Sequence, residues 1–167
     1  VLIHLVMELY QSVGYLLFGT RLKRLSEAFL SDVNRCYRKH RIRFEASWFP
    51  VFYLLSKEEE VSIRTIADAL CVSHSAASQL VRNLEERGLV RLSVARNDAR
   101  RKVVAFTPAG ARLLKQVLPV WNAMQTAMEM LAAESKAGVS FLKALTAIEN
   151  GLQQQSAFER MEQQLRK

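Results

Sequence analysis

The sequence of 167 residues contains little cysteine and histidine, and it lacks the common catalytic motifs. Its two cysteines, Cys36 and Cys71, are too few for a disulfide framework and indicate a reducing compartment, so we expect a cytoplasmic protein. His4, His40 and His74 have no partners at metal-ligand spacing, and HExxH, CxxC, GxSxG and a phosphate-cradling glycine loop are missing. We therefore expect neither an enzyme nor a bound metal or cofactor.

A long uninterrupted apolar run is missing as well. The apolar start, residues 1–18, is interrupted by His4, Glu8 and Gln11, and its positive charges come after the apolar residues. A signal peptide has the reverse order, and a membrane-spanning helix needs about 20 apolar residues. We expect no membrane partner. Half of the residues are hydrophobic, which is enough for the core of one domain or of two joined subdomains.

Acidic residues are in the minority, and the net charge of +8 favours polyanionic partners such as nucleic acid. The position of the basic residues is more informative than their total. Between Arg91 and Lys102 there are five arginines or lysines against the single acid Asp98. This basic segment is therefore a candidate contact for DNA.

The segment from Ser62 to Gly110 has the pattern of a helix-turn-helix. Ser62 stands where a helix N-cap is expected, and apolar residues at helical spacing follow it: Ile66, Ala67 and Leu70. After the short break 71–73, Ser73 can cap a second helix, whose apolar face holds Ala77, Leu80, Val81 and Leu84. Two short helices joined by so tight a turn predict a helix-turn-helix.

A β-hairpin is predicted directly after the second helix. Gly88 is a suitable left-handed stop, residues 89–94 and 102–106 favour strands, and a polar basic tip separates them. Thr107 and Pro108 then predict the start of a further helix, because proline fits the first helical position. The expected fold is mainly α, a winged helix-turn-helix with a small β-hairpin wing and a helical dimerisation lobe.

Direct reading of DNA requires side chains that point from the first turns of the second helix into the major groove. Helical spacing from Ser73 selects these positions: Ser73, His74, Ser75, Ala76, Ser78, Gln79 and Arg82. Gln79 can pair with adenine, and Arg96, Arg100 and Arg101 on the wing are expected to contact the minor groove or phosphates, although ordinary surface charge also explains Arg101. Residues at the first helix start could hold a phosphate: Ser62, Arg64 and Thr65.

The regions on either side of this module have helical seams suited to pairing. Residues 1–40 carry an apolar stripe without proline, either as one long helix or as two helices broken near Gly14 or Gly19. After the wing, apolar residues recur at steps of four and three as far as Leu152, with Gly138 as the expected break. We predict dimerisation helices in 1–43 and 110–167 and a DNA-binding lobe in 44–109.

Several motifs resemble those of the MarR-type winged-helix transcription regulators. They are the serine-rich start of the second helix, "LEERGLV" from Leu84, the wing pair Asp98 and Arg100, and "FTPAG" from Phe106. Upstream, "GTRLKRLSEAF" from Gly19 and "FEASWFPVFYLL" from Phe44 resemble a subgroup in which some members carry a C-terminal acetyltransferase. The likeness covers about residues 7–158, so it is open whether residues 1–6 belong to the module.

The resemblance implies further roles. It implies that Asp98 structures the wing by holding Arg100, and that a small amphipathic effector binds where the DNA-binding lobe meets the dimer helices. The expected aromatic lining of that cleft is Tyr15, Trp48, Phe52 and Trp121. Packing of these aromatic residues in the core is the simpler alternative for the segment around Trp48 and Phe52.

Together these patterns predict a homodimeric DNA-binding transcription regulator, a repressor, that recognises a pseudo-palindromic duplex and is released by an effector. Two alternatives stay open. One is a winged-helix module that binds proteins instead of DNA. The other is a redox-sensing regulator that uses Cys36, with nearby cations stabilising its thiolate: Arg35, Arg38 and Lys39.

Overall fold

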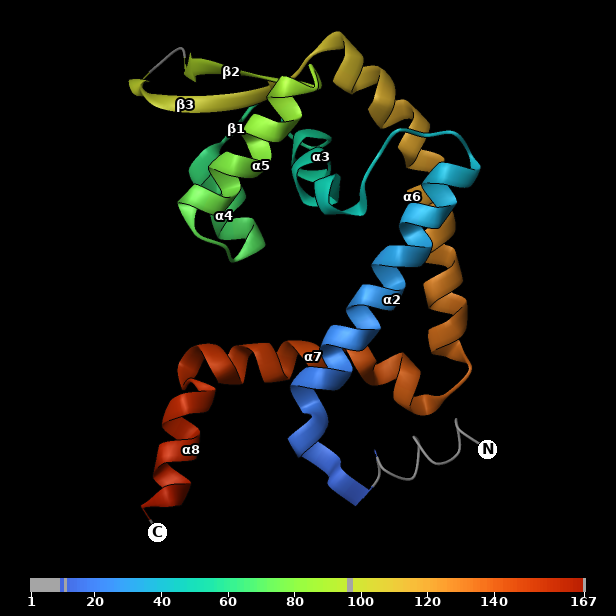
Figure 1. Ribbon diagram of the computed structural model, residues 1–167, viewed down its shortest axis with the longest axis vertical. Coiled ribbons are helices and arrows are strands. Elements are labelled where there is room, and N and C mark those ends of the chain that lie inside the picture. The colour runs from blue at the N-terminus through green and yellow to red at the C-terminus, as the bar shows by residue number, and fades with distance from the viewer. Residues whose placement is uncertain (1–9, 11, 96–97, 167) are drawn as a thin grey trace. The chain divides into compact units, whose positions relative to one another are not determined.

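The computed structural model describes residues 10, 12–95 and 98–166, and the side chains of residue 95 and of residues 98–101 lie outside that description. The chain divides into two compact units, Val1–Val120 and Trp121–Lys167. Most of the described residues are helical, and a small three-stranded antiparallel sheet lies in the first unit (Figure 1). The predicted fold class, mainly α with a winged helix-turn-helix, is confirmed.

The N-terminal stripe is interrupted at Gly14. A short 3-10 helix, η1 (Gly14–Leu17), precedes the α-helix α2 (Phe18–Lys39). Gly14 has a φ of +58°, a left-handed conformation that glycine adopts without a Cβ clash. Of the two arrangements that the sequence allowed, the broken one is present, with its break at Gly14 and with Gly19 inside α2.

An aromatic cluster joins α2 to the winged-helix lobe. It begins at Tyr37 of α2 and continues through the loop residue Phe44 to the helix α3 (Phe49–Leu55), which follows the 3-10 turn η2 (Ala46–Trp48). Phe44 contacts Trp48 and Phe52 edge-on, at centroid distances of 5.5 and 4.9 Å. Such rings contribute much of a core because each buries a large apolar area. The aromatic stretch therefore forms part of the core of the winged-helix lobe.

The winged helix consists of two helices and three strands. The helices are α4 (Ile63–Leu70) and α5 (His74–Glu86), and the strands are β1 (Val61–Ser62), β2 (Val90–Ala95) and β3 (Asp98–Phe106). The strands pair antiparallel in the order β1-β3-β2, with Val61 opposite Val104 and Val90 opposite Phe106. The predicted hairpin is present, and the two-residue β1 adds a third strand that no sequence pattern indicated.

The start of helix α6 (Pro108–Ala133) is hydrogen-bonded to the residues that follow α5. The Thr107 hydroxyl donates to the carbonyl of Gly88 at 2.6 Å and accepts from the N–H of Gly110 at 3.1 Å. A Cβ at Gly110 would lie 1.9 Å from the carbonyl oxygen of Leu89, so only glycine permits this close approach. The predicted Thr107–Pro108 helix start is confirmed.

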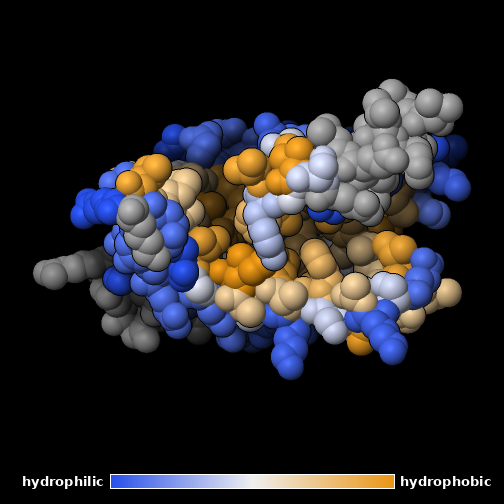
Figure 2. Space-filling view, turned by 90° about the horizontal axis from the view of Figure 1, so that it is seen from below, coloured by the Kyte–Doolittle hydropathy of each residue, from blue (hydrophilic) through white to orange (hydrophobic). Residues whose placement is uncertain are grey.

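The second unit contains the end of α6 and two further helices, α7 (Lys136–Gln154) and α8 (Ala157–Leu165). The expected break at Gly138 is wrong, because Ser135 caps α7 and Gly138 donates to its hydroxyl from within the first turn. Many large apolar side chains of this unit are exposed in the single chain, and the space-filling view shows apolar surface open on the face seen from below (Figure 2).

Candidate nucleic-acid interface

The turn between α4 and α5 is closed by local hydrogen bonds. Cys71 ends α4 in a left-handed conformation (φ 51°), and Ser73 caps α5 by accepting the N–H of Ala76 at 3.2 Å. On its inner side α5 buries Ala77, Val81 and Leu84. Burial of this face fixes which side of the helix points outward. The predicted helix-turn-helix and its two serine caps, Ser62 and Ser73, are confirmed.

The outward side of α5 carries the side chains that were selected for DNA reading. Ser73, His74, Ser75, Ala76, Gln79 and Arg82 are exposed, and Ser78 is half-buried. Two contacts order the start of this face, because Ser75 lies 2.9 Å from the Ser73 hydroxyl and Ser78 lies 3.5 Å from Nδ1 of His74. The α5 face thus presents a compact set of hydrogen-bonding groups to solvent, as a recognition helix must.

A groove of about 430 Å³ lies between α5 and the wing strands. His74, Ser78 and Arg82 line it from the helix, and Ser93 and Lys102 line it from the hairpin. Glu85 fixes this arrangement, because its carboxylate accepts the backbone N–H of Leu92 in β2 at 3.1 Å.

Three polar or charged residues of this groove were not among the predicted DNA contacts: Glu85, Ser93 and Lys102. A signal for Lys102 existed in the basic run of the wing. The contact of Glu85 depends on how β2 docks on α5, which no local pattern reveals.

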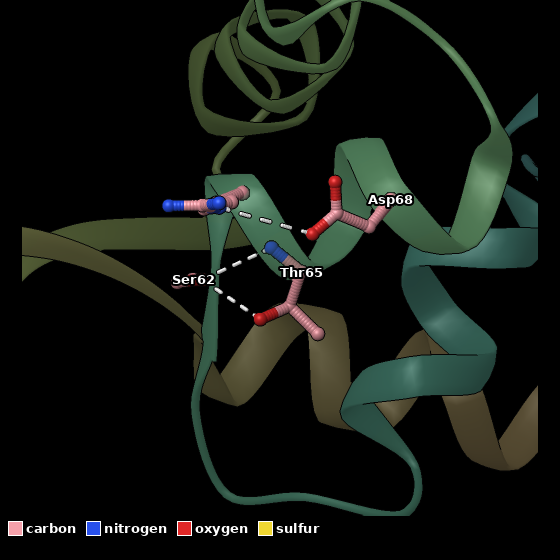
Figure 3. Close-up of polar contacts among 4 residues, drawn as sticks. Ser62, Thr65 and Asp68 are labelled. Atoms are coloured by element: carbon pink, nitrogen blue, oxygen red, sulfur yellow. Dashed lines mark hydrogen bonds and ion pairs between the residues drawn. The ribbon is translucent and has the colours of Figure 1, made fainter.

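At the start of α4, Ser62 forms the predicted helix cap, and the phosphate contact expected there stays a prediction. The Ser62 hydroxyl is buried, accepts the N–H of Thr65 at 3.0 Å and lies 2.8 Å from the Thr65 hydroxyl (Figure 3). Its main role is therefore to cap α4. Arg64 is exposed and 4.0 Å from Asp68, and since an exposed pair of this kind contributes at most about 1 kcal/mol, Arg64 is available to a phosphate.

The wing tip carries the remaining predicted contacts. Arg96 lies outside the described residues, as do the side chains of Asp98, Arg100 and Arg101, whose backbone belongs to β3. The roles of these four residues stay predictions. The hairpin that presents them is described, with a register shift between Val94 and Ala95 next to the tip.

The residues of the predicted effector cleft differ widely in exposure. Tyr15 is 89% exposed, whereas Trp48, Phe52 and Trp121 are 4%, 0% and 7% exposed. The lining therefore stays a prediction, and core packing accounts for Phe52, which contacts Phe44 and Phe106. Cys36 is a half-buried free thiol, and no described contact assigns it a redox role.

Two searches of the described part of the chain bear on other classes of site. No group of three or more His, Cys, Asp or Glu residues in that part is arranged to hold a metal ion. Among the same residues, each helix is too short or too polar to span a bilayer.

Part of the chain that contains this interface matches a known protein family. Residues 44–101 match the model of the MarR family. No curated protein matches the chain. The family match confirms the resemblance to the MarR-type regulators for residues 44–101, while the narrower likeness to modules of acetyltransferase fusions stays a prediction.

Solved structures share the fold at low sequence identity. The S. aureus MepR–DNA complex has a TM-score of 0.68 and 21% identity, over 81% of this chain and 97% of that chain. CouR, a transcriptional repressor bound to a 23-mer DNA duplex, has a TM-score of 0.65 and 22% identity, over 81% and 96%. BpsR of Bordetella bronchiseptica, whose DNA binding is regulated by 6-hydroxynicotinic acid, has a TM-score of 0.65 and 18% identity, over 78% and 91%.

Proposed function

We propose, on the premise that residues 44–101 form a MarR-family winged-helix module, that the protein is a DNA-binding transcription regulator. The observation that carries this proposal is the exposed α5 face beside the wing. His74, Gln79 and Arg82 point outward from a helix whose other side is locked into the core. A helix presented in this way fits the major groove, and the net charge of +8 favours binding to a polyanion.

The regulator acts as a homodimer that binds a pseudo-palindromic site in the cytoplasm. Two α5 helices related by a two-fold axis would enter successive major grooves about 34 Å apart. The exposed apolar residues of the second unit supply the surface that a second copy would cover. MepR and CouR, which share the fold, are described with bound DNA, and this supports the same ligand here.

Repression released by a small amphipathic effector is the proposed mode of control. CouR is described as a repressor and BpsR as regulated by a small acid, which supports both parts of this mode. The proposed lining remains Tyr15, Trp48, Phe52 and Trp121. An effector would act by preferring one spacing of the two recognition helices, because a ligand shifts an equilibrium only by its differential affinity.

Selection of duplexes from a random library by the purified protein tests the function. We expect enrichment of an inverted repeat, and affinity for it that falls steeply as salt rises because counterions are released. The competing function is a protein-interaction module. Weak binding that does not depend on salt, with no sequence enriched, would favour that module and contradict the proposal.

A further inference from the structure

A second charged concavity lies at the far end of α5 from the predicted DNA-reading residues. It consists of two adjoining hollows of about 690 and 500 Å³ that share Arg41, Arg43, Trp48 and Arg87. Arg38 completes one hollow and Arg112 the other. We call this surface the arginine hollow, defined by Arg38, Arg41, Arg43, Trp48, Arg87 and Arg112.

Arg87 is held in place before any ligand arrives. Its guanidinium lies over the Trp48 ring at 5.0 Å, and its Nε donates to Oδ1 of Asn83 at 3.0 Å. An Nη atom is also 3.8 Å from the Glu45 carboxylate. Stacking and hydrogen bonding restrict the rotamers of this long side chain, so a ligand would lose less entropy in ordering it.

Backbone structure brings the other arginines to the same place. Arg41 has a φ of 57°, an unusual left-handed conformation for a side chain with a Cβ, in the turn that directly follows α2. Its N–H bonds to the Arg38 carbonyl at 3.0 Å, which fixes the turn. Arg38 therefore projects from the last turn of α2, Arg41 and Arg43 from the loop, and Arg112 from the first turns of α6.

The charge of the arginine hollow is far from balanced. Five arginines line it, and among the described lining residues Glu45 is the one carboxylate. Beneath the charges the floor is aromatic and aliphatic, formed by buried Phe44, Trp48 and Leu113. Uncompensated positive charge over a low-dielectric floor concentrates the electric field and attracts anions. Guanidinium groups bind phosphate and carboxylate oxygens through paired, charge-assisted hydrogen bonds.

From these observations we infer that the arginine hollow binds a small multivalent anion, one that carries phosphoryl groups or several carboxylates. The ligand is a small molecule and not the DNA read by α5, because Arg87 follows the last residue of that 13-residue helix. At the helical rise it lies about 20 Å from the His74 end. The anion would bridge the ends of α2 and α5 and the start of α6, and so would stabilise the support of the recognition helix.

Calorimetric titration of the full chain with inorganic pyrophosphate, and separately with citrate, at constant ionic strength tests this inference. We expect saturable binding of one anion per chain. In the double variant Arg38→Gln/Arg43→Gln, binding should weaken at least about tenfold, as expected for lost charge-assisted hydrogen bonds. The matched control Arg35→Gln/Lys39→Gln removes the same charge from exposed positions of α2 outside the hollow. Its affinity should stay within about threefold, because these two side chains do not line the hollow and so lose no direct hydrogen bond to the anion.

Two further measurements locate the ligand. Trp48 and Trp121 are the only tryptophans, so in a Trp121→Phe background the fluorescence change on adding pyrophosphate reports the surroundings of Trp48, which the hollow shares with the proposed effector cleft. Arg87→Lys keeps the charge but loses the planar stack on Trp48, and it should also weaken binding at least about tenfold. Circular dichroism confirms that each variant is folded.

Three results would overturn the inference. They are absence of saturable anion binding, equal weakening in the two double variants, and displacement of pyrophosphate by random duplex DNA with the same dependence on Arg38 and Arg43. The last would identify the surface as a DNA-backbone contact. Because the anion titration contains no operator DNA, a negative result leaves the proposed recognition by α5 standing.

Discussion

The winged-helix lobe and the second unit differ in how far they bury their apolar side chains. In the lobe, Val51, Phe52, Ile66, Val81, Leu84 and Val104 are all completely buried. Of the described residues in α7 and α8, none is buried. The same contrast runs along α6, where Leu113 and Val117 of the first unit are buried but Met128 and Leu131 of the second unit are exposed.

This difference indicates different sources of stability. The lobe buries its core within one chain, so its stability does not depend on covering the outward residues that we propose to contact DNA. The second unit leaves several large apolar side chains exposed, and exposed apolar surface of this kind marks interaction sites: Met130, Val139, Leu142, Phe158, Met161 and Leu165. The proposed second copy would cover them, which would account for both the sequence pattern and the exposure.

The largest effect is expected in the lobe. Phe52→Ala should lower the free energy of unfolding by about 3–5 kcal/mol, because Phe52 is 0% exposed and its loss leaves a cavity between Phe44 and Phe106. Denaturant unfolding followed by circular dichroism measures this loss. The same substitution at exposed Phe158 should have an effect that diminishes as the protein is diluted. A dilution-dependent loss for Phe52→Ala would contradict the contrast.

A charge placed on the exposed apolar face of α7 should break the proposed dimer. Leu142 is 73% exposed in the single chain, and Leu142→Glu would bury an unpaired carboxylate in the interface. Burying this carboxylate should cost about 3 kcal/mol, and the dissociation constant of the dimer should therefore rise more than about a hundredfold. Sedimentation velocity measures the change, with Lys143→Glu at the neighbouring exposed position as control. Unchanged assembly in Leu142→Glu would remove this surface from the dimer.

Gln79 tests base reading by the lobe. Gln79→Ala should cost about 1–3 kcal/mol on the selected duplex and relax the preference at one base position. Fluorescence anisotropy on the selected and single-substituted duplexes measures both effects. Equal losses on selected and random DNA would instead make Gln79 a backbone contact.

Arg100 tests phosphate binding by the wing. Arg100→Ala should weaken binding to every duplex and lower the slope of log affinity against log salt by about one, since one phosphate contact is lost. Binding isotherms at several salt concentrations give the slope. An unchanged slope would exclude Arg100 from the phosphate contacts.

The smallest effect concerns the capping box of α8. Hydrogen bonds from the backbone N–H and hydroxyl of Ser156 hold the pKa of Glu159 below its ordinary value, with a smaller contribution from Arg160. Folding lowers the pKa of Glu159, so the ionised cap adds to the free energy of unfolding at pH values above the unfolded-state pKa. This added stability is lost as the pH falls through the folded-state pKa. In Ser156→Ala the Glu159 pKa should rise toward the ordinary value in an NMR titration, whereas Ser140→Ala should leave it unchanged.

The parts of the fold that sequence analysis predicted are those governed by local chemistry. Ser62, Ser73 and Thr107 could be identified as helix caps because each bonds to a backbone N–H three residues later. The break at Gly14 was one of two readings, since glycine permits a turn without requiring one. The strand β1 was missed because two residues carry no periodicity and pair only with distant β3.

The candidate site was predicted only where its residues share one helix. Helical spacing selected the exposed α5 positions, including His74 and Gln79, and the structure leaves them exposed. Spacing could not show that Arg38, Arg87 and Arg112 line adjoining hollows, because they come from three separate helix ends. That arrangement depends on tertiary packing.

Hydroxyl-radical footprinting of the selected duplex tests most directly whether two α5 helices read one DNA site. The account predicts two protected regions whose centres lie about 34 Å, one helical turn, apart, both lost together in Leu142→Glu at concentrations where that variant is monomeric. A single protected region, or protection that is the same on any sequence, would contradict it.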